Sequence, residues 1–75
     1  MPKPFSGSLV IKLLLTMYGF QPVSQKGSHV KLKRVRGKEV NITIVPLHRE
    51  LAHGTLRGVL KLANIEYEDF LKQIR

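Results

Sequence analysis

The sequence contains no cysteine, which excludes a disulfide framework and a thiolate metal site, so nothing in it indicates an oxidising compartment. It also lacks a long hydrophobic run. Its most apolar stretch, LVIKLLLTMYGF, is interrupted by Lys12 and is shorter than the roughly 20 apolar residues that cross a bilayer. No strongly basic start precedes this stretch and no small-residue cleavage site follows it, so it does not resemble a signal peptide. We therefore expect a soluble protein of the cytoplasm.

Acidic residues are scarce, with 5 Asp and Glu against 13 Lys and Arg, for a formal net charge of +8. The imbalance is concentrated in one segment, which carries six basic residues and no acidic one: Lys26, Lys31, Lys33, Arg34, Arg36 and Lys38. With 43% apolar residues in a chain of 75, we expect residues 1–75 to form one domain with a small core. A compact basic domain favours a polyanionic partner, most often nucleic acid, although a basic solvated surface is the alternative.

Capping signals and periodicity predict a helix followed by three strands. Ser6 is a good N-cap, Phe5 can pack onto Val10, and Gly19 can end the helix in the left-handed conformation. Two stretches of period two flank Gly27-Ser28, a connection suited to a tight hairpin. Gly37-Lys38 can turn the chain again before VNITIV, and Pro46 ends the third strand.

The remainder of the chain predicts a loop and two helices. Thr55 can cap a helix that runs to Ala63, with Asn64 as a left-handed stop. A last short helix is expected from about Glu66 to Ile74, with its apolar residues on one face. The fold class is therefore α+β, in the order α-β-β-β-α with a three-stranded antiparallel sheet and an extra C-terminal helix.

Alternation along the strands predicts which side chains face the helices. The residues expected to point inward are apolar: Val23 in the first strand, Val30 and Leu32 in the second, and Val40, Ile42 and Ile44 in the third. The residues expected to point outward are polar: Ser24, Lys26, His29, Lys31, Lys33, Asn41 and Thr43. One polar face would then carry His29 beside three lysines.

The chemistry of this face suits RNA. Histidine titrates near neutral pH and can remove a proton, while lysines bind a phosphodiester and stabilise charge that develops on it. In RNA the 2′-hydroxyl can attack its own phosphate once a base removes its proton, which needs no metal. The alternatives are that His29 is an ordinary residue at a strand edge and that the lysines form a solvated face.

The two other histidines have weaker signals. His48 follows the third strand and has three interpretations: a second acid–base group, a phosphate ligand or a hydrogen bonder that fixes the loop, of which we favour the last. His53 is expected in a turn before the second helix. A zinc site built from His29, His48 and His53 has no cysteine and no H-E-x-x-H spacing to support it.

Three segments together resemble the HicA family of small messenger-RNA interferase toxins: YGFQPVSQKGSHVKLK, VNITIVPLH and HGTLRGVLKLANIEYEDF. The resemblance covers about residues 6–70. Its most specific element is G-F-x-x-x-x-x-K-G-S-H, from Gly19 to His29, and it is supported by P-x-H at 46–48 and G-T-L-R at 54–57. The departures are Asn64, where glycine is common, and Glu66, where a Ser or Thr cap is common.

The resemblance implies a double-stranded-RNA-binding-domain-like fold, RNA cleavage without metal or cofactor, and a HicB-type antitoxin that covers the active face. It implies that His29 is catalytic and that Gly27 and Ser28 shape its turn. Together with the charge pattern, the resemblance predicts that RNA is bound by Lys26, Gly27, Ser28, Lys31 and Lys33. His48 is a secondary candidate for the site. The resemblance does not identify the general acid, for which His48, Lys26, Lys31 and water are the candidates.

Two other classes of function fit the same residues. A non-catalytic RNA-binding domain would use the fold and the charge without His29 chemistry. A protein-interaction module would use the first helix, whose polar residues form only one narrow stripe, at Ser8, Lys12 and Thr16.

Overall fold

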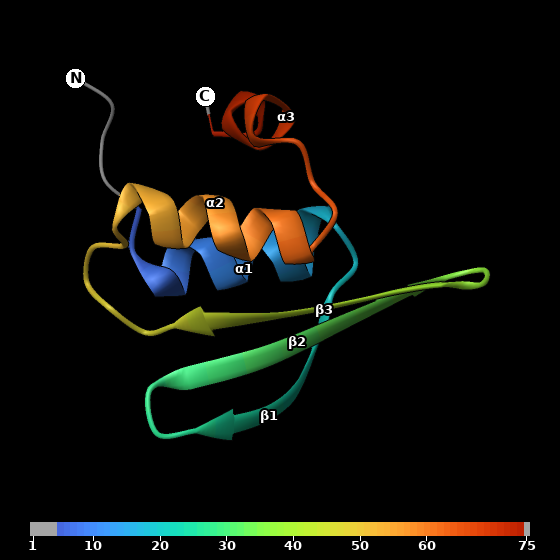
Figure 1. Cartoon of the computed structure of the whole chain (residues 1–75), viewed down its shortest axis with the longest axis horizontal. Helices are drawn as coiled ribbons and strands as arrows, with labels where there is room; N and C mark the ends of the chain where they lie inside the picture. Colours follow the sequence, from blue (N-terminus) through green and yellow to red (C-terminus); the bar gives the residue numbers. More distant parts are fainter. Residues whose placement is uncertain (1–4, 75) are drawn as a thin grey trace.

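The structure, a computed structural model, describes residues 5–74 and has the expected α+β architecture (Figure 1). The elements follow in the order α1 (Gly7–Met17), β1 (Gln21–Lys26), β2 (His29–Arg36), β3 (Glu39–Pro46), α2 (His53–Leu62) and α3 (Tyr67–Lys72). The three strands form an antiparallel sheet in the order β1-β2-β3. All three helices lie on one side of this sheet, so the opposite side, here called the open face, has no helix over it (Figure 1). Within residues 5–74, no helix is long and apolar enough to cross a membrane.

The signals that bound α1 act as predicted. The Leu9 amide donates a hydrogen bond to Ser6 Oγ at 3.0 Å, which satisfies one of the free N–H groups of the first turn. After the helix, Gly19 has a φ of 75°, a conformation that glycine adopts without steric cost. Val10 and Leu14 have no exposed surface, and they anchor α1 in the core.

Two tight turns set the sheet register. Gly27-Ser28 joins β1 to β2 and Gly37-Lys38 joins β2 to β3, as predicted, and the glycine has positive φ in both, 58° and 60°. Glycine first in a two-residue loop is the pattern of type II′ hairpin turns. In the β2–β3 hairpin the short turn fixes the pairing of the whole ladder. Arg36 pairs with Glu39, and the ladder continues without a shift to His29 and Pro46.

The prediction for β3 was wrong, because the strand presents its other face to the helices. Asn41 and Thr43 are buried, whereas Val40, Ile42 and Ile44 are 52%, 42% and 46% exposed on the open face. Directly paired residues in a sheet share a face, and Thr43 pairs with the buried Leu32. The buried Thr43 hydroxyl donates to the Val59 carbonyl of α2 at 2.8 Å, so its burial leaves no unpaired polar group.

Three smaller predictions also fail. Val23 lies at a register shift in β1 and is 54% exposed instead of facing the core. The helix α2 begins earlier than predicted, at His53 with Ala52 as N-cap, so Thr55 is no cap and His53 is helical. Asn64 does adopt the predicted left-handed conformation after α2, with a φ of 58°.

Arg34, on the core side of β2, is buried at 6% exposure and has no carboxylate within 4 Å among residues 5–74. Its guanidinium donates to Asn41 Oδ1 from two nitrogens, to the Tyr18 carbonyl at 3.3 Å and to the Ala63 carbonyl at 3.0 Å. Tyr18 and Ala63 are the C-caps of α1 and α2, where free carbonyls favour a cation. The guanidinium also lies 4.7 Å from the centroid of the Phe20 ring. Arg34 thus joins both long helices to the sheet.

Candidate functional site

His29 stands at the first position of β2, immediately after the Gly27-Ser28 turn, and its side chain is exposed on the open face. Its neighbours across the sheet are Lys26 on β1 and Pro46 on β3. A hollow of about 550 Å³ opens beside it, and its lining comes from all three strands: Ser24, Lys26, His29, Lys31 and Ile44. The structure therefore brings together His29 and two of the three predicted lysines.

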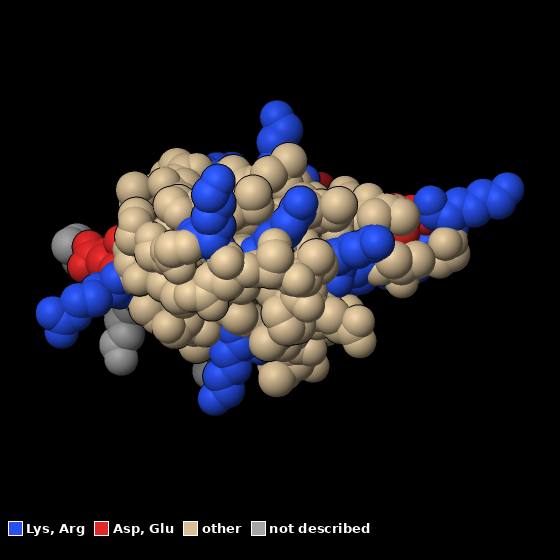
Figure 2. All heavy atoms as spheres, turned by 90° about the horizontal axis from the view of Figure 1, so that it is seen from below, with Lys and Arg blue, Asp and Glu red and all other residues tan. Residues whose placement is uncertain are grey.

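The charge on this side of the molecule is almost entirely positive. Figure 2 shows the open face, with Lys and Arg side chains projecting across it and acidic residues visible only toward its two ends. Within residues 5–74 the single ion pair closer than 4 Å joins Arg36 to Glu39. Lys26 and Lys31 therefore have no carboxylate partner there, and a bound anion would not need to displace one.

Lys33 lies farther along the same face. It pairs with Gln21 and Ile42, one step beyond Lys31, and lines a separate hollow of about 380 Å³ between β1 and β2. It therefore extends the positive row without touching the hollow of His29. Because successive nucleotides are several ångströms apart, such a row can meet successive phosphates of one strand.

Gly27 and Ser28 act through their backbone. The Gly27 carbonyl accepts a hydrogen bond from Gln25 Nε2 at 3.0 Å, which stabilises the turn. The Ser28 carbonyl accepts one from the Leu47 amide at 2.6 Å, which holds the segment after β3 beside the turn. These bonds fix the backbone at the position from which His29 projects.

His48 and His53 do not line the hollow of His29. The His48 carbonyl accepts a hydrogen bond from the Gly7 amide at 2.9 Å, so this residue fixes the loop through its backbone. His53 begins α2, and its ring lies 5.3 Å from that of Tyr67. Among residues 5–74 no three His, Cys, Asp or Glu side chains gather in a way that could hold a metal ion.

The sequence matches, over residues 7–65, a family model described as the HicA toxin of bacterial toxin–antitoxin systems. The chain belongs to this family. The match contains every strand and both long helices, and it confirms the resemblance drawn from the motifs. No curated protein and no solved structure matches the chain. Membership makes the chain the toxin of a toxin–antitoxin system, which implies an antitoxin protein as its partner.

Ile44 of the toxin lines the hollow of His29, although the alternation along β3 predicted that it would face the core. With Ile42 and Val40 it forms an apolar row beside the lysines of β2, because Lys31 pairs with Ile44 and Lys33 with Ile42. The two-residue turn at 37–38 could have predicted the exposure of Ile44, because this turn fixes which residues of β2 and β3 pair. The open face therefore combines cations, a histidine and an apolar wall, which suits the phosphate, the hydroxyl and the ring faces of a nucleotide.

Proposed function

We propose that the toxin is a metal-independent endoribonuclease that cleaves messenger RNA with His29 as the general base. The observation that carries the proposal is the shared hollow of His29, Lys26 and Lys31, whose two lysines have no carboxylate within 4 Å among residues 5–74. A neutral imidazole at this position can accept a proton, and the two ammonium groups can bind the phosphate next to it. Because the substrate is messenger RNA, the proposal also assigns the toxin to the cytoplasm.

The proposed step is transesterification within the RNA. His29 removes the proton of a 2′-hydroxyl, and the resulting oxygen attacks the adjacent phosphorus while the bond to the 5′-oxygen breaks. The products are a 2′,3′-cyclic phosphate and a free 5′-hydroxyl. Lys26 and Lys31 stabilise the charge that develops on the phosphate oxygens. The proton for the leaving oxygen comes from one of these lysines or from water, and His48 does not line the hollow.

The remaining residues of the site orient the substrate. Ile44 offers an apolar wall to the sugar or base, and Lys33 contacts the next phosphate along the strand. Gly27 and Ser28 hold the turn, so that the His29 side chain needs little reorganisation before reaction.

The proposal is tested by cleavage of single-stranded RNA in the presence of EDTA. His29→Ala should slow cleavage by about 10²–10⁴-fold, the usual contribution of a general base, and should keep its RNA affinity, measured by fluorescence anisotropy. His48→Ala is the matched control, because it removes an exposed imidazole outside the hollow, and it should cleave at nearly the wild-type rate. Wild-type protein that binds RNA without cleaving it would instead indicate a non-catalytic RNA-binding domain, and cleavage by His29→Ala at the wild-type rate would exclude His29 as the base.

We also infer that the antitoxin is of the HicB type and covers the open face. The row Val40, Ile42 and Ile44 is exposed beside lysines, so this face fits a partner with an apolar centre and acidic groups around it. The same RNA assay includes the stoichiometric complex as a further sample. Cleavage should disappear in it, and undiminished cleavage would contradict the proposed position of the antitoxin.

A further inference from the structure

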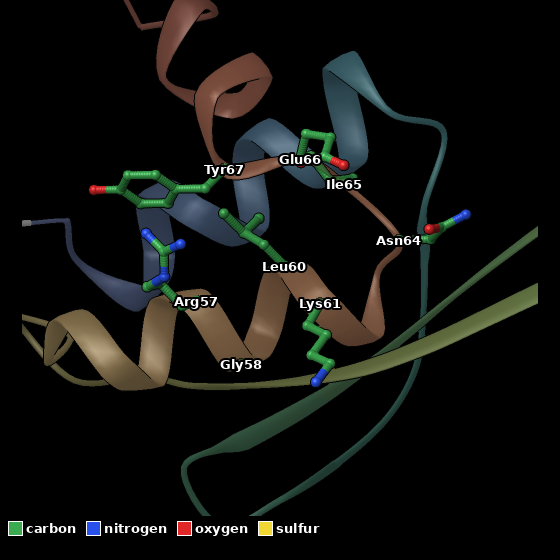
Figure 3. Close-up of a pocket in the computed structure, with 8 residues that line it drawn as sticks. All are labelled: Arg57, Gly58, Leu60, Lys61, Asn64, Ile65, Glu66 and Tyr67. Carbon is green, nitrogen blue, oxygen red and sulfur yellow. The ribbon is translucent and has the colours of Figure 1, made fainter.

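The helical layer carries a second hollow, on the side of α2 that faces α3 (Figure 3). Its volume is about 420 Å³, within the range of small-molecule sites. Three parts of the chain line it, namely α2, the connection after α2 and the start of α3: Arg57, Gly58, Leu60, Lys61, Asn64, Ile65, Glu66 and Tyr67. We call it the α2–α3 cleft. Its elements lie on the covered side of the sheet, whereas the hollow of His29 lies on the open face (Figure 1).

A fixed aromatic ring and a planar cation form one end of this cleft. The guanidinium carbon of Arg57 lies 4.5 Å from the centroid of the Tyr67 ring, and the His53 ring meets the same ring edge-on at 5.3 Å. Figure 3 shows the guanidinium of Arg57 turned toward the ring of Tyr67. Arginine planes and aromatic rings are the groups on which proteins stack unpaired bases. Because Arg57 lies over the Tyr67 ring, the other face of its guanidinium is the surface that this pair leaves for a base.

Gly58 lines the cleft without contributing a side chain. It lies on α2 between Arg57 and Lys61, and a Cβ atom at this position would have no neighbour within 4 Å (Figure 3). Its φ is not in the left-handed region, so the backbone does not require glycine here. Glycine weakens the interior of a helix, and no packing contact explains it at this position. Without a side chain at Gly58, this part of the cleft lining stays open.

The charge of the lining favours an anion. Arg57 and Lys61 are exposed, and within residues 5–74 neither has a carboxylate within 4 Å. Among the described residues of the lining Glu66 is the only acid, which leaves one net positive charge with Arg57 and Lys61. The Lys61 ammonium points along the other side of α2 in Figure 3, but its flexible stem allows it to reach a phosphate at the edge of the cleft.

We propose that the α2–α3 cleft binds one nucleotide of an RNA chain, with the base stacked on Arg57 and Tyr67 above Gly58 and the phosphate held by Lys61. The proposal rests on the proposed function in taking the nucleotide to be part of the RNA substrate. It gives the toxin a contact to RNA in the helical layer, separate from the cleavage site. A strand bound at both places would pass around the edge of the domain.

The experiment measures nucleotide binding directly, so its result does not depend on cleavage. Adenosine 5′-monophosphate is titrated into the full-length ¹⁵N-labelled toxin, and amide shifts are followed by NMR. We expect the largest shifts in residues 57–67. Gly58→Leu should weaken binding by at least about tenfold, the effect of losing one stacked base, because its side chain fills the cleft. Glu66→Gln should strengthen binding, since it removes the one negative charge of the lining.

Gly54→Leu is the matched control for Gly58→Leu. Gly54 lies one turn earlier on the same helix, also has no atom within 4 Å of a Cβ position, and does not line the cleft. Arg57→Gln is the second test variant, because it removes the stacking cation from an exposed position and does not threaten the core. It should weaken binding several-fold.

Three outcomes would overturn the proposal. Shifts confined to the hollow of His29 would mean that the nucleotide binds only on the open face. Equal affinities of Gly58→Leu and Gly54→Leu would mean that the cleft is not the site. Inorganic phosphate that bound as tightly as the nucleotide would exclude stacking on Arg57 and Tyr67.

Discussion

Replacing Arg34 by methionine should destabilise the fold severely, although the two side chains are similar in length. The substitution removes all the donors that reach Asn41 Oδ1 and the carbonyls of Tyr18 and Ala63. An acceptor left unpaired inside a protein costs about 1 kcal/mol or more, so three acceptors together cost about 3 kcal/mol. Methionine keeps most of the apolar contacts with Phe20, and it avoids the desolvation of a buried cation, which keeps the estimate at this lower limit.

Urea unfolding followed by far-UV circular dichroism measures this loss. For a domain of this size, about 3 kcal/mol corresponds to a decrease in Tm of about 12–24 °C. Burial lowers the pKa of the Arg34 guanidinium, but arginine remains protonated at any pH of the assay, so the loss should be the same at pH 6 and pH 8. Arg34→Lys keeps the charge but not the planar fork, and it should recover only part of the stability.

Arg36→Met is the matched control, because it makes the same chemical change two residues away on the same strand. The Arg36 side chain is 52% exposed and makes one ion pair across the β2–β3 turn, so its loss should change stability little. If Arg34→Met and Arg36→Met unfolded at the same urea concentration, the reasoning would be refuted. The carbonyls of the two helix ends would then be hydrated equally well without Arg34.

Two further predictions concern the packing of α1 and the response to acid. A methyl group at Gly7 would overlap the Pro46 carbonyl oxygen, so Gly7→Ala should destabilise the domain by about 3 kcal/mol in the same urea assay and should slow RNA cleavage, since Pro46 pairs with His29. An unchanged unfolding midpoint would show that the segment at Pro46 and Leu47 can move away from the methyl group at little cost in stability. Hydrogen bonds from Asn41 and Asn64 hold the pKa of the Glu39 carboxyl below its usual 4.5. The ionised carboxylate therefore stabilises the fold above about pH 4.5, and this contribution is lost as the pH falls through the lowered pKa. Tm measured between pH 7 and pH 3 should fall less in Glu39→Gln than in the wild type, and equal decreases would contradict this role.

The sequence predicted the features that depend on local chemistry. The Ser6 cap, the left-handed Gly19 and Asn64, and both glycine turns are set by residues close in the chain. The alternation of β2 was also predictable, since Val30 and Leu32 alternate with the polar residues His29, Lys31 and Lys33. His29, Lys31 and Lys33 form the part of the positive face that β2 contributes, so they could be located before the fold was known.

Hydrophobicity predicted the wrong orientation of β3, because the more apolar face of this strand is not the face that the helices cover. Apolar alternation favours Val40, Ile42 and Ile44 as the buried set, while the helices actually cover Asn41, Thr43 and Val45. The information was nevertheless present in the turn. A two-residue connection at 37–38 pairs Leu32 with Thr43 and Arg34 with Asn41, and paired residues must share a face. Register derived from a turn thus outweighs hydrophobicity when the two disagree in a short strand.

The orientation of β3 connects the stability of the domain to its candidate site. Arg34 faces the core because it alternates with Leu32, and it needs an acceptor from β3, which Asn41 supplies. Once Asn41 and Thr43 face inward, Ile42 and Ile44 must face outward, so the apolar wall beside His29 follows from the polar groups under the helices. In the opposite orientation Arg34 would lose Asn41, and the hollow of His29 would have Asn41 and Thr43 along its far side instead of isoleucine. The hydrogen bonds between Arg34 and Asn41 under the helices therefore stabilise the same orientation of β3 that places Ile44 beside His29, where the proposed cleavage would take place.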